Sequence, residues 1–124
     1  MRRTLPALLL LLVLAGAATT RAAPPAETKS KVARIVFVGK QNACACTRKT
    51  IDASWKALQS ALGNKSRYPI EELKIDVDGA KVDGYRSKRA FVALPAIYFL
   101  DGAEGVKELL QGEVTEAKIR AVLK

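Results

Sequence analysis

The chain has no histidine, and its single methionine is Met1. The absence of histidine excludes Cys-His and Ser-His-Asp nucleophilic machinery and every histidine-ligated metal site. Only two cysteines are present, Cys44 and Cys46, with one alanine between them. A disulfide across one residue closes almost no loop, so a purely structural bridge is disfavoured. The sequence therefore indicates a reactive or ligand-binding pair of thiols.

Acidic residues are also scarce, with 12 against 21 basic residues and a formal net charge of +9. The basic residues are scattered along the chain and no nucleic-acid-binding motif accompanies them, so no nucleic-acid partner is expected. A solvated basic surface is the simplest interpretation of this charge. Attraction to acidic partners or to anionic surfaces is the alternative.

Long apolar runs are limited to residues 5–15, which follow two arginines and precede a series of small residues. This run is shorter than the roughly 18 residues that a membrane span needs. A basic start, an apolar centre and small residues before a cleavage site are typical of a secretory signal peptide. We predict a signal peptide over residues 1–22, with cleavage after Ala22 or Ala18, and an exported protein, periplasmic or secreted. No stable membrane insertion is expected after its removal, and an uncleaved anchor is the alternative.

Residues 23–31 are rich in alanine, proline and polar side chains, which predicts a flexible lead-in. Residues 32–124 suffice for one domain. The predicted elements of that domain are, in order, a strand over 32–38, a helix over 47–62, a strand over 73–78, a helix over 81–91, strands over 96–100 and 105–110, and a helix capped by Thr115.

The spacing of apolar residues supports these elements. Ile51, Trp55 and Leu58 recur at helical spacing and predict one buried helix face. Residues 73–78 alternate between apolar and polar side chains, which predicts a strand with Asp76 and Asp78 on its wetter face; a metal-ligand role for these acids is the alternative. A strand–helix–strand unit followed by a hairpin and a helix predicts an α/β fold with a central mixed sheet flanked by helices.

This order resembles the thioredoxin-like superfamily over residues 32–124. Three stretches carry the resemblance: Cys44 and Cys46 at the first strand–helix junction, residues 73–78 as the second strand, and Leu94-Pro95-Ala96 opening the third strand before an Asp-Gly turn. The resemblance implies that Pro95 is cis and lies against the cysteine pair. It also implies that Leu94, Pro95 and Ala96 form the groove for a partner's extended chain.

The cysteine motif departs from the usual pattern of that superfamily. One residue separates the cysteines instead of two, and Ala43 precedes them where an aromatic residue is usual. By the resemblance, Cys44 is the attacking nucleophile and Cys46 the resolving thiol. A helix N-terminus and the nearby Arg48 and Lys49 favour the thiolate form, so we expect a lowered pKa at the site.

The sequence thus predicts a thiol–disulfide oxidoreductase or isomerase. Its partners would be protein thiols and disulfides together with a redox-recycling protein. No cofactor is expected, because the redox-active disulfide itself carries the electrons. The side chains of residues two apart point to nearly opposite sides of a helix, so a bond between Cys44 and Cys46 requires non-helical backbone and is strained. We therefore expect this disulfide to be more oxidising than that of thioredoxin, which suits oxidation or isomerisation of exported proteins. A carrier that binds Cu(I) or a similar soft metal through Cys44 and Cys46 is the main alternative. The other alternative is a protein that keeps the fold only to interact with partners.

Overall fold

The computed structural model describes residues 31–63 and 67–124. The predicted signal peptide and residues 23–30 of the predicted lead-in lie outside the described residues. The described chain contains, in order, β1 (Arg34–Gly39), α1 (Ala45–Leu62), β2 (Ile70–Lys74), α2 (Gly79–Lys88), β3 (Ala96–Leu100), β4 (Val106–Gln111) and α3 (Glu116–Val122). The protein is therefore α/β, as predicted. No helix within the described ranges has the length and apolar character that crossing a membrane requires.

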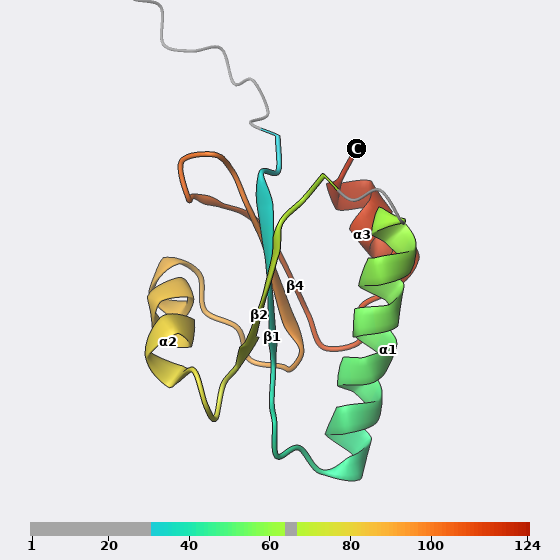
Figure 1. The fold of residues 1–124 in the computed structure, drawn as a ribbon, viewed down its shortest axis with the longest axis vertical. Coiled ribbons are helices and arrows are strands. Elements are labelled where there is room, and N and C mark those ends of the chain that lie inside the picture. The colour runs from blue at the N-terminus through green and yellow to red at the C-terminus, as the bar shows by residue number, and fades with distance from the viewer. Residues whose placement is uncertain (1–30, 64–66) are drawn as a thin grey trace, which may run out of the picture.

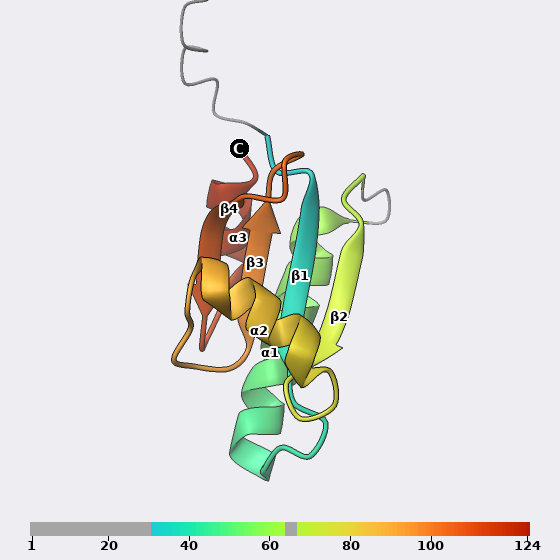
Figure 2. The same ribbon diagram turned by 90° about the vertical axis from the view of Figure 1, so that its left-hand side faces the viewer.

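The strands form one mixed sheet in the order β2-β1-β3-β4, which Figure 2 shows behind α2. β1 is parallel to β2 and antiparallel to β3, and β3 is antiparallel to β4. Val38 lies opposite Leu73 on one side and Ala96 on the other. The last residues of β1 and β2 and the first residue of β3 thus share one end of the sheet. We call it the cysteine end, because the chain leaves β1 there towards Cys44.

Helices cover both faces of this sheet. Figure 1 shows α1 and α3 on one side and α2 on the other. Alternate side chains of β1 serve the two faces: Ile35 and Phe37 pack on the side of α1 and α3, whereas Val36 and Val38 pack on the side of α2. All four are buried, as are the side chains of β3. Burial on both faces explains why these strands read as continuous apolar runs.

The second strand differs from its prediction. β2 ends at Lys74, and the residues that follow form a turn in which Val77 is 60% exposed. The Lys74 carbonyl accepts hydrogen bonds from the N–H groups of Val77 (3.1 Å) and Asp78 (2.6 Å). The Lys74 N–H in turn donates to Asp78 Oδ2 (2.9 Å). These bonds close a turn while the polar–apolar alternation continues, so the predicted strand is wrong beyond Lys74.

The first helix begins at Ala45, two residues before its predicted start, so Cys46 lies inside it. Its predicted end is confirmed. Gly63 has a φ of 67°, and its N–H donates to the Gln59 carbonyl at 3.0 Å. A positive φ at this position is what makes glycine the favoured residue after a helix.

The other two helices differ from prediction to different degrees. α2 begins two residues early and ends at Lys88, so Phe91, predicted as its last residue, lies beyond it. The predicted cap of α3 is confirmed, because the Thr115 hydroxyl accepts a hydrogen bond from the Lys118 N–H at 3.4 Å. The hairpin of β3 and β4 also lies within one residue of its predicted position.

Candidate functional site

The two cysteines lie where the chain turns from the sheet into α1. Cys44 is the N-cap residue of the helix, with extended backbone (φ −64°, ψ 162°), whereas Cys46 lies in the first helical turn. Both thiols are free and both residues are exposed. N–H groups in the first turn of a helix lack partners within the helix and attract negative charge. The pair therefore combines solvent access with an environment that suits a thiolate.

Thr47 is the closest polar neighbour of the first thiol. Its Oγ1 lies 3.2 Å from Cys44 Sγ. The Thr47 hydroxyl, and next the Thr47 N–H, hold the pKa of the Cys44 thiol below its usual value. A lowered pKa raises the fraction of the nucleophilic thiolate near neutral pH. Sequence reasoning missed Thr47, although a hydroxyl three residues after an N-cap position is a local signal for such a contact.

Neither of the expected charge modulators, Arg48 and Lys49, forms a hydrogen bond with a thiol among the described residues. Arg48 Nη2 donates to the Ala43 carbonyl at 3.4 Å, within the loop that leads to the helix. Arg48 and Lys49 instead flank a shallow groove of about 650 Å³ beside the cysteines. The first turn of α1 contains no acidic residue. The groove is lined by Ala43, Ala45, Arg48, Lys49, Asp52, Ala53 and Lys56. Its apolar lining residues are all alanines, and three of its four charged residues are basic.

Asp76 anchors the loop before the cysteines. Its two carboxylate oxygens accept hydrogen bonds from the N–H groups of Gln41 and Asn42, each at 2.9 Å. These two bonds hold the pKa of Asp76 below its usual value. The turn that ends β2 is thereby tied to the loop that begins the site. The contact joins residues more than 30 positions apart, which no local pattern reveals.

The residues of the predicted substrate groove lie at the start of β3. The Leu94–Pro95 peptide bond is cis, as the resemblance implies, and Pro95 is buried. The Pro95 carbonyl accepts a hydrogen bond from the Gly112 N–H at 2.9 Å. Leu94 packs against the core cluster on the α2 side of the sheet. Ala96 opens β3 and is buried opposite Val38.

The structure links Pro95 to α1 at a point well beyond the cysteines. The buried Ser54 hydroxyl lies 3.4 Å from the Gly112 carbonyl and accepts a hydrogen bond from the Val114 N–H at 3.3 Å. Ser54 stands eight residues after Cys46, or about 12 Å along the helix axis. No hydrogen bond among the described residues joins either cysteine to Leu94-Pro95-Ala96. The two parts of the predicted site thus share the cysteine end of the sheet, where the chain leaves β1 and enters β3.

The described residues include no group of three or more histidine, cysteine or acidic side chains that could hold a metal ion. Comparison of the chain with known proteins finds no matching family, no matching curated protein and no matching solved structure. A functional proposal therefore depends on the geometry and chemistry of the cysteine pair.

Proposed function

We propose that the protein is an exported thiol–disulfide oxidoreductase of thioredoxin-like type that acts through Cys44 and Cys46. One observation carries the proposal: Cys44 is an exposed thiol at a helix N-cap, its pKa is lowered by Thr47, and a second thiol follows two residues later. Nucleophilic cysteines of redox proteins occupy this kind of microenvironment.

The arrangement of the sheet supports the thioredoxin-like part of the proposal. A parallel β1–β2 pair joined through α1, followed by an antiparallel β3–β4 hairpin and α3, is the order of elements on which the resemblance rests. The cysteines follow the first strand, and Pro95 directly precedes the third. Export, to the periplasm or outside the cell, is proposed from the signal peptide predicted over residues 1–22.

The proposed reaction proceeds in two exchanges. The Cys44 thiolate attacks one sulfur of a partner disulfide, forms a mixed disulfide and expels the other partner sulfur as a thiolate, which takes a proton from water. The Cys46 thiolate then attacks Cys44 Sγ and expels the second partner sulfur. Two electrons pass to the partner, and Cys44 and Cys46 become a disulfide that a redox-recycling protein must reduce. The reverse sequence oxidises a partner dithiol.

The groove beside the cysteines and the Leu94-Pro95-Ala96 segment are the proposed contact surfaces for the partner's chain. The groove is lined by three alanines and by more basic than acidic side chains, which suits a segment with small and acidic side chains.

The disulfide form of the pair should be oxidising. Cys44 is extended and Cys46 is helical, so joining the sulfurs requires local rearrangement. We expect a reduction potential above thioredoxin's value of about −270 mV. Equilibration with glutathione buffers measures it, and a value at or below thioredoxin's would contradict this expectation.

Trapping tests the proposal as a whole. Cys46→Ser removes the resolving thiol, so a mixed disulfide on Cys44 should accumulate in cells and be seen on non-reducing gels. Mass spectrometry then identifies the attached protein. Cys44→Ser, the matched control, should trap far less. If neither variant forms adducts, wild type fails to reduce insulin, and copper co-purifies only when both cysteines are present, the protein is a metal carrier and the proposal fails.

A further inference from the structure

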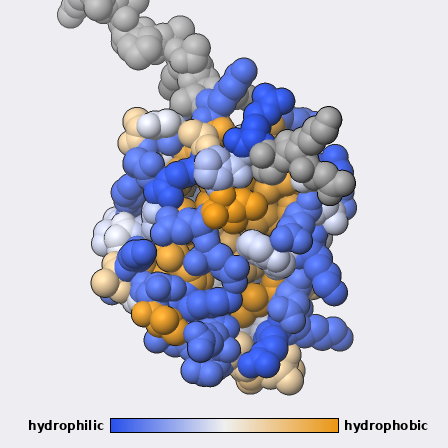
Figure 3. All heavy atoms as spheres, in the orientation of Figure 1, coloured by the Kyte–Doolittle hydropathy of each residue, from blue (hydrophilic) through white to orange (hydrophobic). Residues whose placement is uncertain are grey.

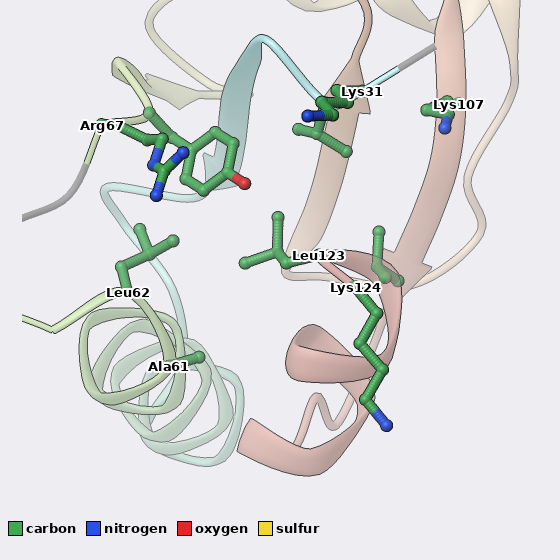
Figure 4. A pocket seen from close by; sticks show the side chains of 10 residues that line it. Lys31, Ala61, Leu62, Arg67, Lys107, Leu123 and Lys124 are labelled. Carbon is green, nitrogen blue, oxygen red and sulfur yellow. The ribbon is translucent and has the colours of Figure 1, made fainter. Parts of the chain in front are cut away.

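A second pocket lies at the end of the molecule opposite the cysteines. It has a volume of about 460 Å³, within the range of roughly 300–1,000 Å³ typical of small-molecule sites. Its walls come from the chain before β1, the end of α1, the chain before β2, the start of β4 and the end of α3. Figure 4 shows the lining residues, which are Lys31, Val32, Ala61, Leu62, Arg67, Tyr68, Lys107, Val122, Leu123 and Lys124. We call this the terminal pocket.

The walls of the terminal pocket are continuous with the hydrophobic core. Six of the lining residues are partly buried and pack against the core cluster beneath α1 and α3. In Figure 4, Leu62 and Leu123 face each other across the cavity, with Ala61 below them. Figure 3 shows that, on the side drawn there, hydrophobic residues are exposed between hydrophilic ones. Filling such an open apolar hollow with an apolar group is favourable, because it removes apolar surface from water.

The charge of the terminal pocket is of one sign. Four of its lining residues are basic and none has an acidic side chain. Within the part of the chain that the structure describes, none of the four forms an ion pair or side-chain hydrogen bond. Elsewhere, Arg34 and Arg120 both do. The side chain of Lys124 points away from the cavity in Figure 4. Lys31, Arg67 and Lys107 remain as uncompensated charges around the opening.

We propose that the terminal pocket binds an amphipathic monocarboxylate, with its apolar chain between Leu62 and Leu123 and its carboxylate against Arg67. The guanidinium suits a carboxylate because it donates two parallel hydrogen bonds to it. Lys31 and Lys107 add long-range attraction. This site is distinct from the cysteine site, because the 18 residues of α1 separate the two by about 27 Å.

Titration of the full chain with decanoate, below the concentration at which decanoate aggregates, tests the proposal. We expect saturable one-to-one binding by calorimetry, with amide resonance shifts centred on Tyr68 and Leu123. Decanol lacks the charge and should bind at least tenfold more weakly, and decyltrimethylammonium should not compete. Equal binding of all three ligands would overturn the proposed carboxylate specificity. Absence of any saturable binding would overturn the site itself.

Variants locate the binding. Arg67→Gln should weaken decanoate binding about tenfold while leaving decanol binding unchanged. Lys118→Gln is the matched control, since Lys118 is an exposed lysine of α3 outside the pocket. Leu123→Asp should abolish binding of both ligands, with circular dichroism to confirm folding. If Leu123→Asp unfolds, resonance shifts in the wild type decide the location. Cys44→Ser should bind decanoate as wild type does, so this test is separate from that of the redox proposal.

Discussion

The helices on the two faces of the sheet are held in place by different contacts, although both faces have an apolar core. On one face, α1 buries Ile51 and Leu58, and Trp55 meets Phe37 edge-to-face with ring centroids 4.9 Å apart. On the other face, α2 buries only Val82. The first face is stabilised mainly by apolar burial. The second needs additional contacts to keep its helix in place.

Those additional contacts centre on Arg34 at the start of β1. Its guanidinium donates to Glu71 Oε2 (3.0 Å), to the Tyr85 hydroxyl (2.6 Å) and to Glu104. We call these four residues the Arg34 clasp. It connects β1, β2, α2 and the β3–β4 turn, and the Arg34 side chain is 25% exposed. Charged contacts near solvent respond to salt and pH, whereas apolar packing changes much less in moderate concentrations of a salt such as sodium chloride. The cysteines therefore stand on the face that ionic conditions disturb least.

Removing a core side chain beneath α1 should have the largest effect. Leu58 is fully buried against the sheet. Leu58→Ala should lower the free energy of unfolding by about 2–5 kcal/mol, because a buried cavity replaces the side chain. Denaturant unfolding measures this loss, and it should be the same in low and high salt. Leu58→Met, which keeps most of the volume, should cost less than about 1.5 kcal/mol. A loss from Leu58→Ala that varies with salt would break the comparison between the faces.

Breaking the Arg34 clasp should have a smaller, salt-dependent effect. Arg34→Gln should cost about 1–2 kcal/mol in low salt and less in high salt. Arg34 holds the pKa of Glu104 below its usual value. That contribution is present above the unfolded pKa of glutamate and is lost as pH falls through the folded value. Arg120→Gln, which removes an exposed pair with Glu116, is the control and should cost about 0.5 kcal/mol or less. Equal costs for Arg34→Gln and Arg120→Gln would show that the clasp does not hold α2.

The smallest effect is expected at the cysteine site, which lies on the face covered by α1. Thr47→Val removes the hydroxyl beside Cys44 Sγ, so the pKa of the thiol should rise towards its usual value. The alkylation rate of Cys44 should then fall severalfold at neutral pH, and its pH profile should move to higher pH. Cys46→Ser as background isolates the Cys44 signal. Thr50→Val, whose lost hydroxyl contacts the Cys46 carbonyl, should leave the profile unchanged. An unshifted profile in Thr47→Val would assign the lowered pKa to the helix alone.

Local patterns in the sequence predict much of this fold. The buried strands β1 and β3 read as apolar runs, and the stripe of α1 is clear at helical spacing. The pattern misleads after Lys74, because a two-residue period fits a strand and also fits a turn whose polar groups bond each other. Asp78 decides between them by accepting the Lys74 N–H, and this bond is not visible in a hydrophobicity pattern.

The candidate site, too, could be predicted from the sequence only in part. The cysteine pair is evident because it is unique in the chain. Asp76, which holds the loop before it, could not be placed, since its bonds to Gln41 and Asn42 depend on β2 lying parallel to β1. The contacts of Gly112 with Ser54 and with Pro95 could not be placed either, since these residues come together only in the folded chain. The sequence thus reveals which chemical groups the site contains, whereas the positions of these groups relative to one another depend on the fold.

The Ser54 hydroxyl has one more consequence. Apolar burial is non-directional, so by itself it leaves a helix some freedom to roll about its own axis. A buried hydroxyl bound to both Gly112 and Val114 removes that freedom, because hydrogen bonds weaken steeply when misaligned. The direction in which both thiols point from the helix axis is therefore set more than two helical turns away, by a side chain that takes no part in their chemistry.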